Sequence, residues 1–522
     1  MDFQTLVKIL RAGRVPDFHP DADSFAYADA LDAQDGLSHL REQFIIPTRT
    51  SLKKRALDGT VPDAPSPRPR TNGSTKSSHP DKKYGDDDND PSIYLIGNSL
   101  GAQPRAVRAH VDAQLETWAS LGVNGHFTAL ENSPLGASWQ DLAEECGRKF
   151  VPIVGAASAS EVVVMNTLTL NLHLMMASFY RPTEKRHKIL LEWRPFPSDW
   201  YAIQSQIAWH GLDPATSMVE IQPDADQYLA TAAILAAIDE HADSTALLLL
   251  PGIQYYTGQL LDMARITAHA KARGVPVVGW DLAHAAGNVE LRLHEWGVDF
   301  AVWCTYKYLN AGPGAIAGAF VHERHHGRDE PQDEDGEAKG SSSVWGAGQF
   351  RHRLAGWYGA DKSVRFDMAK TFVPTPGAPG YQLSNPSAID LAALSAALSV
   401  FGQTSMAALR DKALLLTAYA EHLLGKSLPL PSSSGNGDAA VRPAFRIITP
   451  ANPAERGSQL SLLLLRPGLL DRVSRYLVEN GVVFDARKPD VIRVAPVPMY
   501  CSFVDVWRFA DVFRRAIAVS SA

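Results

Sequence analysis

The sequence predicts an α/β fold in which a mostly parallel sheet flanked by helices forms a large domain, followed by a smaller α+β domain. Two observations predict this fold class. Short, continuously apolar segments alternate with helical patterns between residues 161 and 322, which is typical of a parallel sheet covered on both faces. The chain also has 522 residues, 45% of them hydrophobic, which is enough apolar material for a large core.

The expected elements of the large domain follow one another along the chain. Strands are expected at 161–165, 188–192, 246–250, 275–281, 300–305 and 317–322, and helices at 170–180 and 262–273. The C-terminal part predicts strands at 460–465, 482–484 and 491–494, and helices at 469–480 and 505–519. Because ligands bind beyond the carboxyl ends of parallel strands, the polar residues that follow each strand are the candidates for function.

The chain is expected to divide into four segments. These are an N-terminal helical segment at 1–56, a disordered insertion at 57–91, a large domain at 92–370 and a small C-terminal domain at 371–522. The insertion and a second segment at 327–343 are polar, rich in Pro, Gly and Ser, and poor in large apolar residues. Such segments cannot bury enough surface to offset their ordering entropy, so we expect them to be mobile.

Composition excludes several classes of protein. The net charge of −7 argues against a general nucleic-acid binder, which would carry a basic excess. The three cysteines, Cys146, Cys304 and Cys501, are far apart and odd in number, so neither a disulfide framework nor a cysteine zinc site is expected. No apolar run approaches the ~20 residues that cross a bilayer. We therefore expect a cytoplasmic protein that does not bind membranes.

Three short motifs match known signatures but stand in the wrong context. The segment 97–101, GNSLG, matches the nucleophile turn of serine hydrolases, but it follows the insertion and precedes the main sheet, which favours a plain glycine turn. The segment 322–326, HERHH, contains H-E-x-x-H, yet it follows a strand, whereas zinc binding needs a helix. The glycines of 312–314 lead into a strand, which is the wrong order for a dinucleotide site. We expect no metal.

Asp281 and Lys307 each follow or end an expected buried strand. A lysine at the mouth of a buried sheet is costly unless it is paired, deprotonated or covalently used. A lysine that binds an aldehyde and a carboxylate that holds a ring nitrogen are the basic requirement of pyridoxal 5'-phosphate (PLP) catalysis. The alternative is a Lys–Asp ion pair at a strand end, and the spacing alone does not separate the two.

A PLP cofactor would also need a phosphate site and a stacking partner. The segment 166–169 joins an expected strand to an apolar helix, where free N–H groups and a hydroxyl converge, although a simple helix cap is an alternative there. Phe196 lies in a proline-rich loop and could stack on the ring, or could anchor that loop in the core.

Long segments of the chain resemble kynureninases, which are PLP enzymes of the aspartate aminotransferase fold group, fold type I. The matching segments are 94–104, 165–182, 196–206, 255–259, 281–320, 355–359, 384–386 and 492–500. Outside the two insertions the resemblance covers nearly the whole chain. One departure is Pro251, which stands where the family usually has a small hydroxyl residue near the phosphate.

The resemblance implies a role for individual residues. Lys307 would bind the cofactor covalently, Asp281 would hold the ring nitrogen, and Tyr306 would contact the phosphate and shuttle protons. The other cofactor-binding residues that it implies are Leu168, Thr169, Phe196, Pro197, Ser198, Asp199, His284, Trp357 and Asn385. Arg493 would grip the substrate carboxylate, with His126 and Ser384 near the aromatic end of the substrate.

The activity that the resemblance implies is hydrolysis of the Cβ–Cγ bond of L-kynurenine and 3-hydroxy-L-kynurenine. The products would be L-alanine and anthranilate or 3-hydroxyanthranilate, in tryptophan catabolism and NAD biosynthesis, and the enzyme would be a homodimer. The alternatives are another fold type I enzyme, either an aminotransferase or a cysteine desulfurase, and an inactive metabolite-binding homologue. A desulfurase needs a mobile cysteine, and Cys304 lies inside an expected strand.

Overall fold

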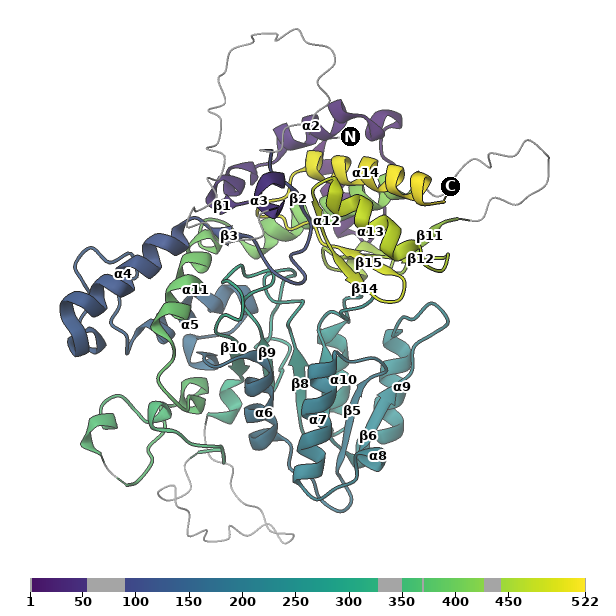
Figure 1. Ribbon diagram of the computed structural model, residues 1–522. Helices are drawn as coiled ribbons and strands as arrows, with labels where there is room; N and C mark the ends of the chain where they lie inside the picture. Colours follow the sequence, from purple (N-terminus) through teal and green to yellow (C-terminus); the bar gives the residue numbers. More distant parts are fainter. Residues whose placement is uncertain (1, 54–89, 327–349, 369, 427–442, 522) are drawn as a thin grey trace, which may run out of the picture. The chain divides into compact units, whose positions relative to one another are not determined.

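The computed structural model describes residues 2–53, 90–326, 350–368, 370–426 and 443–521 (Figure 1). The expected mobile segments, 57–91 and 327–343, lie outside the described residues except for residues 90 and 91. The chain forms two compact units. The large unit comprises 106–408 with 455–457, and the small unit comprises 1–105, 409–454 and 458–522.

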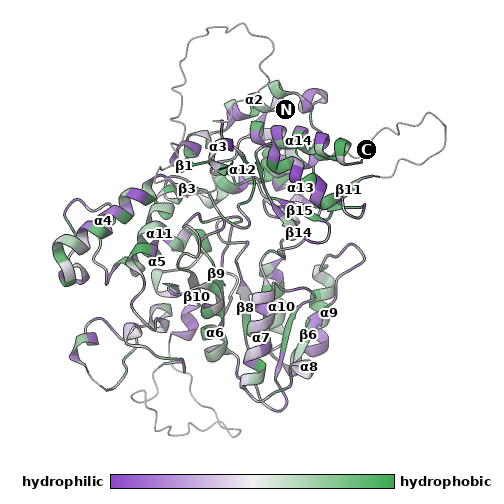
Figure 2. Cartoon of the chain, in the orientation of Figure 1, coloured by the Kyte–Doolittle hydropathy of each residue, from purple (hydrophilic) through white to green (hydrophobic). Residues whose placement is uncertain are grey.

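The boundaries of the two units differ from those of the expected domains, 92–370 and 371–522. Helix α11 (Ala388–Phe401) belongs to the large unit because it packs on α4 (Ala106–Leu121) and α5 (Leu142–Val154). It is mostly hydrophobic along its length, so it needs burial on more than one side (Figure 2).

The large unit is built on a sheet of seven strands, in the order β4-β10-β9-β8-β7-β5-β6. Their bounds are Val162–Val164 (β4), Gly318–Val321 (β10), Phe300–Trp303 (β9), Val278–Asp281 (β8), Thr245–Pro251 (β7), Lys188–Glu192 (β5) and Met218–Ile221 (β6). Only β10 runs against its neighbours, and the remaining pairs are parallel. The expected mostly parallel sheet is therefore confirmed.

Helices connect the parallel strands, as crossover connections require. They are α6 (Leu168–Phe179), α7 (Pro197–Trp209), α8 (Pro214–Ser217), α9 (Thr231–His241) and α10 (Met263–Ala272). Helix α6 packs on β9 and β10. The rings of Phe179 in α6 and Phe300 in β9 lie 5.2 Å apart between their centres, and both side chains are buried. This packing fixes the C-terminal end of α6 against β9.

The small unit contains a four-stranded sheet in the order β11-β12-β15-β14. Its strands are Phe445–Ile447 (β11), Leu460–Leu464 (β12), Val491–Val494 (β15) and Asp485–Arg487 (β14), and they are antiparallel. Its main helices are α1 (Phe3–Arg11), α2 (Phe25–Gln34), α12 (Met406–Gly425, of which residues from 409 belong here), α13 (Leu469–Glu479) and α14 (Phe503–Ser521). The N-terminal segment is part of this unit, because α2 packs on α14. Residues 93–94 also belong to it, since β2 (Ile93–Tyr94) pairs with β13 (Val482–Val483).

Among the described residues, no single helix is both long and apolar enough to cross a membrane. The consecutive helices Ala388–Phe401 and Met406–Gly425 meet that test only when they are taken together.

Candidate active site

The large unit contains a cavity of about 530 Å³ where β5 and β8 end. Residues from five separate segments of the chain line it, as expected for a site at the carboxyl ends of parallel strands. The predicted residues that line it are Leu168, Thr169, Phe196, Ser198, Asp199, Asp281, His284, Tyr306 and Lys307.

Lys307 reaches this cavity from the turn that follows β9. Its Nζ lies 3.1 Å from Nε2 of His284, within hydrogen-bond distance. The same nitrogen lies 5.9 Å from the centre of the Phe196 ring and 5.8 Å from that of Tyr306. The amine is therefore held between an imidazole and two aromatic rings.

Three carboxyl groups line the cavity. Asp281 ends β8, Asp199 lies in the first turn of α7, and Glu192 ends β5. Burial, together with the neighbouring Asp281, raises the pKa of Asp199 well above its usual value. Burial raises the pKa of Glu192 to about 8. At neutral pH Glu192 is therefore mostly protonated.

The buried carboxyl oxygens fit a protonated ring nitrogen. Oδ1 of Asp199 and Oε2 of Glu192 have no hydrogen-bond partner within the described part of the chain, although such atoms are normally paired when buried. A protonated pyridine ring in the cavity would supply a donor and a positive charge beside Asp281 and Asp199. The donors and acceptors present therefore fit PLP.

The junction of β4 and α6 fits a phosphate group. Asn166 has a left-handed φ of 49°, which turns the chain sharply into the helix. The side chain of Thr167, the N-cap residue of α6, makes no capping hydrogen bond, which does not support the alternative of a simple helix cap. Nearby, the hydroxyls of Thr169 and Ser198 lie 2.5 Å apart. N–H groups at a helix start with adjacent hydroxyls are a common phosphate site.

Phe196 lines the cavity from the segment before α7. It is the residue before α7, whose first residue is Pro197, and its side chain is 40% exposed, which argues against a core anchor. The edge of its ring meets the ring of Tyr255 at 5.3 Å between centres. Pro197 does not line the cavity, and its place at the first helical position suits the fixed φ of proline.

Other predicted residues of the large unit lie outside the cavity lining. Trp357 is half exposed, and its Nε1 donates to the backbone oxygen of Arg365 at 2.9 Å. Ser384 and Asn385 are exposed, and the ring of His126 packs against Trp139. Their roles remain predictions.

Arg493 belongs to the small unit, where its side chain is 1% exposed. The guanidinium contacts Asp485, with 2.9 Å between Nη2 and Oδ1. Its role as the carboxylate-binding residue also remains a prediction.

Sequence reasoning missed Glu192 and Tyr255 as residues of the cavity. Glu192 is the last residue of an apolar run, KILLE, so it carried the same signal as Asp281: a carboxylate at a strand end. Tyr255 stands in a matching segment of the resemblance, 255–259, but no simple pattern marks its ring as facing a ligand.

The three misleading motifs have structural explanations. GNSLG at 97–101 follows β2 in the small unit, where the amide of Asn98 donates to Gln459, and it lies outside the seven-stranded sheet. His322 directly follows β10, and Glu323–His325 form a 3-10 turn instead of an α-helix. The glycines of 312–314 lie in a turn before β10.

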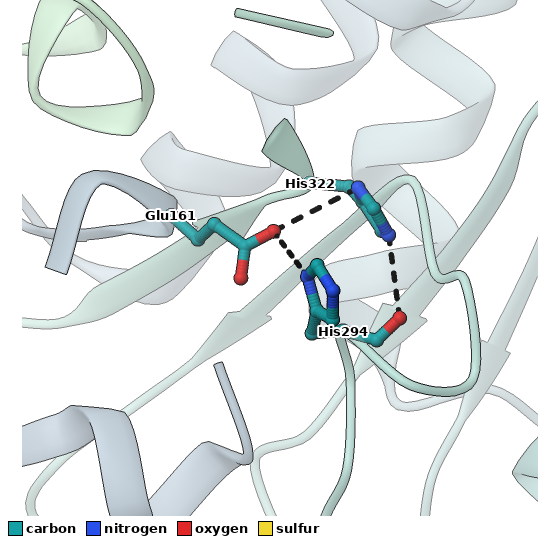
Figure 3. A group of neighbouring side chains, drawn as sticks. All are labelled: Glu161, His294 and His322. Carbon is teal, nitrogen blue, oxygen red and sulfur yellow. Dashed lines mark hydrogen bonds and ion pairs between the residues drawn. The ribbon is translucent and has the colours of Figure 1, made fainter. Parts of the chain in front are cut away.

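His322 instead meets Glu161 and His294, a group whose possible ligand atoms lie within 4.8 Å of one another (Figure 3). Each residue already has a partner in the protein. Oε1 of Glu161 lies 2.9 Å from Nδ1 of His294 and accepts the backbone N–H of Glu323. Nδ1 of His322 accepts the backbone N–H of Arg324 at 3.2 Å, which uses its lone pair. The group therefore ties β4, β9 and β10 together at their far ends.

Comparison with known proteins defines the class. The Aminotransferase class-V family model matches residues 93–356. A cysteine desulfurase from Thermococcus onnurineus NA1 has a similar fold, with a TM-score of 0.62 and 15% identity over 82% of this chain and 95% of that one. A lysine-to-alanine mutant of C-DES with glycine covalently linked to its PLP cofactor is similar too, with a TM-score of 0.61 and 16% identity over 80% and 96% of the two chains. The fold and the cavity define a PLP-dependent enzyme of fold type I.

A second family model, the Kynureninase C-terminal domain, matches residues 409–513. "Kynureninase 1" of Neurospora crassa is 62% identical over 99% of both chains, and "Kynureninase" of Pyricularia oryzae is 59% identical over 96% of both. The chain belongs to the kynureninase family. The aminotransferase, desulfurase and inactive-homologue alternatives are accordingly not favoured.

Proposed function

We propose that this enzyme hydrolyses the Cβ–Cγ bond of L-kynurenine and 3-hydroxy-L-kynurenine to L-alanine and the corresponding anthranilate, in tryptophan catabolism and NAD biosynthesis. The observation that carries the proposal is Lys307, whose Nζ lies 3.1 Å from His284 in a cavity lined by three buried carboxyl groups. Family membership supplies the substrate class, and the cavity supplies the chemistry.

The residues of the cavity would hold PLP by a covalent link to Lys307 and by three further contacts. Asp281 and Asp199 would face its ring nitrogen, Phe196 would stack on the ring, and the start of α6 with Thr169 and Ser198 would bind its phosphate. The bound cofactor supplies an electron-withdrawing ring that stabilises negative charge at the α carbon of the substrate.

Lys307 and Tyr306 would move protons during the reaction. Nζ of Lys307 takes the proton from the α carbon of the substrate, and Nε2 of His284, 3.1 Å away, orients this amine. Burial raises the pKa of Tyr306 above its usual value, so its phenol stays protonated and serves as a proton donor when the Cβ–Cγ bond breaks. A water molecule adds to the γ carbonyl before this bond breaks, so that its oxygen becomes part of the anthranilate carboxylate.

Substrate recognition is assigned to residues beyond the cavity lining. Arg493 would bind the α-carboxylate, because a guanidinium matches a carboxylate with two parallel hydrogen bonds. Ser384 and His126 would lie near the aromatic end. Trp357 and Asn385 would complete the cofactor site.

We also propose that the enzyme is a homodimer. Exposed aromatic side chains gather on the large unit, where the ring of Phe366 lies 5.6 Å from that of Phe127 and 5.5 Å from that of Trp357. Phe127 is 59% exposed, which is unusual for a phenylalanine unless a partner covers it. The dimer would bring Trp357 toward the site of a second chain.

A cytoplasmic location is proposed on the state of the cysteines. Cys146, Cys304 and Cys501 are all free and buried, which suits a reducing compartment. Cys304 follows β9 instead of lying inside it, is 2% exposed, and its Sγ lies 3.7 Å from the backbone oxygen of Ala283. This confined thiol does not favour the desulfurase alternative.

Steady-state kinetics test the proposal. The protein loaded with PLP should release fluorescent anthranilate from L-kynurenine, and Lys307→Ala should lose this turnover completely because no other amine lines the cavity within the described residues. Assaying both substrates gives the preference between them. A Lys307→Ala variant with full activity, or wild-type protein without activity on either substrate, would contradict the proposal.

A further inference from the structure

Arg493 in β15 is held by a carboxylate on the neighbouring strand. Asp485 in β14 is its partner in the register of the two antiparallel strands, so both side chains lie on the same face of the sheet. Oδ1 of Asp485 accepts a hydrogen bond from Nε of Arg493 at 3.0 Å and lies 2.9 Å from Nη2. One carboxylate oxygen thus contacts the Nε–Nη2 edge of the guanidinium.

A second arginine holds the same carboxylate. Arg487 stands two residues after Asp485 in β14, on the same face of the strand. Its Nε lies 3.0 Å from Oδ1, and its Nη2 donates to Oδ2 at 3.2 Å. The side chain of Arg487 is 36% exposed, whereas that of Arg493 is 1% exposed. Asp485 therefore lies between an outer and an inner guanidinium.

This arrangement suits an incoming anion. Two positive charges share one negative charge, so the three residues together carry a net positive charge. A guanidinium binds a carboxylate through two parallel N–H donors, so a ligand carboxylate at the inner guanidinium would be favourable. Because Asp485 contacts the Nε–Nη2 edge, such a carboxylate would bind at the other edge, which is formed by the two Nη atoms.

We propose that Asp485 is a positioning residue, which fixes the Arg493 guanidinium so that its Nη edge receives the α-carboxylate of the substrate, and that Arg487 holds Asp485 in place. The inference rests on the proposed function, because that function assigns the carboxylate to Arg493. Both arginines contact the same carboxylate, and rotation of the Arg493 guanidinium would break two contacts to Asp485 at once.

The test uses the holoenzyme with Asp485→Asn and compares two amines that differ in one group. Binding of L-alanine, which has the α-carboxylate, and of ethylamine, which lacks it, is followed by the absorbance of the bound cofactor. Asp485→Asn should weaken the binding of L-alanine about tenfold, which is the loss expected for one charge-assisted hydrogen bond. The binding of ethylamine should not change. The KM for L-kynurenine should rise by a similar factor while kcat changes little.

Matched variants separate positioning from stability. Asp505→Asn breaks another aspartate–arginine pair of the small unit, with Arg41 at 2.5 Å, and the Asp505 side chain is 7% exposed against 11% for Asp485. It should lower the melting temperature without changing L-alanine binding. Asp485→Glu should recover part of the affinity. Arg487→Gln should cause a smaller loss of L-alanine affinity, because Arg487 contacts Asp485 and not the substrate. Its side chain is partly exposed, so this variant can still be measured if Asp485→Asn does not fold.

The outcomes distinguish the positioning role of Asp485 from the proposed reaction. The positioning role is overturned if Arg493→Ala weakens L-alanine binding but neither Asp485→Asn nor Arg487→Gln weakens it. It is also overturned if Asp505→Asn weakens L-alanine binding as much as Asp485→Asn does. If Arg493→Ala leaves L-alanine binding unchanged, the carboxylate assignment and the positioning role both fail. If the wild type binds L-alanine with the expected variant effects but does not cleave kynurenine, the proposed reaction fails and the positioning role stands.

Discussion

At the scale of single residues, Glu192 makes stability depend on pH. Burial raises its pKa from the usual 4.5 to about 8, so the folded protein keeps a proton that the unfolded chain releases. Unfolding therefore releases a proton between about pH 4.5 and pH 8, and the free energy of unfolding should fall as the pH rises through this window. The stabilising contribution is fully present below about pH 4.5. Each unit of difference between the folded and unfolded pKa changes the free energy of unfolding by about 1.4 kcal/mol.

Glu192→Gln should remove this contribution to the pH dependence in the cofactor-free protein. Urea unfolding at several pH values between 5 and 8 measures it, with Glu220→Gln on the exposed side of β6 as the control. The control should keep the wild-type slope. If Glu192→Gln shows the same slope as the wild type, the carboxyl does not carry the proton.

Much of the cavity was predictable residue by residue. Asp281 and Lys307 stood out because a charged group after an apolar strand needs a partner or a use. Phe196 stood out because a ring in a proline-rich loop could stack on a cofactor, and the resemblance gave it the same role. Glu192 escaped because a final glutamate in KILLE looks like the polar end of a strand. Its importance depends on β5 lying near β8 in the sheet, which spacing along the chain does not show.

At the scale of elements, the strands that carry the site are tightly packed against one another. Gly279 in β8 faces Phe300 in β9, and a Cβ added to this glycine would lie 2.3 Å from Cζ of that ring. Gly279→Ala should therefore destabilise the protein by about 1–3 kcal/mol, as overpacking does. It should also weaken cofactor binding, because Asp281 ends the same strand two residues later.

Urea unfolding and a PLP titration measure both effects. Gly402→Ala is the control, because its Cβ would meet only backbone oxygens at 3.6 Å and its φ of −64° suits alanine. The control should change stability by less than about 1 kcal/mol. Equal stability of the two variants would contradict the packing argument.

The existence of most strands could be predicted, but their directions and neighbours could not. Continuous apolar runs marked β5, β7, β8, β9 and β10. They did not reveal that β10 runs antiparallel to β9. Strand β6 was missed because only its last residue is buried, so its sequence shows no apolar run.

At the scale of the whole molecule, we expect a dimer that buries the exposed aromatic side chains of the large unit. Sedimentation velocity should give about twice the chain mass of 56.8 kDa for the wild type. Replacing Phe127 and Phe366 together by serine should shift the protein toward the monomer, because the apolar surface that would drive association is lost.

Trp209→Ser is the control for this experiment, because Trp209 is 86% exposed at the end of α7 and is not part of that aromatic group. It should leave the dimer intact. A monomeric wild type, or a double variant that stays fully dimeric, would contradict the assignment of this surface.

The division into units was the least predictable feature at this scale. Segments from both ends of the chain form the small unit, and α11 joins the large unit. Composition marks where the chain is polar or apolar, but which distant segments pack together depends on long-range contacts. The fold class was predictable because it depends only on alternating strands and helices.

Lys307 is proposed to bind the cofactor covalently, and one measurement tests this bond directly. The holoenzyme is reduced with borohydride, digested and analysed by mass spectrometry. We expect a single pyridoxyl phosphate adduct on the peptide that contains Lys307 in the wild type. We expect no adduct on the corresponding peptide of Lys307→Ala. An adduct on another lysine, or none on this peptide from a PLP-loaded wild type, would contradict it.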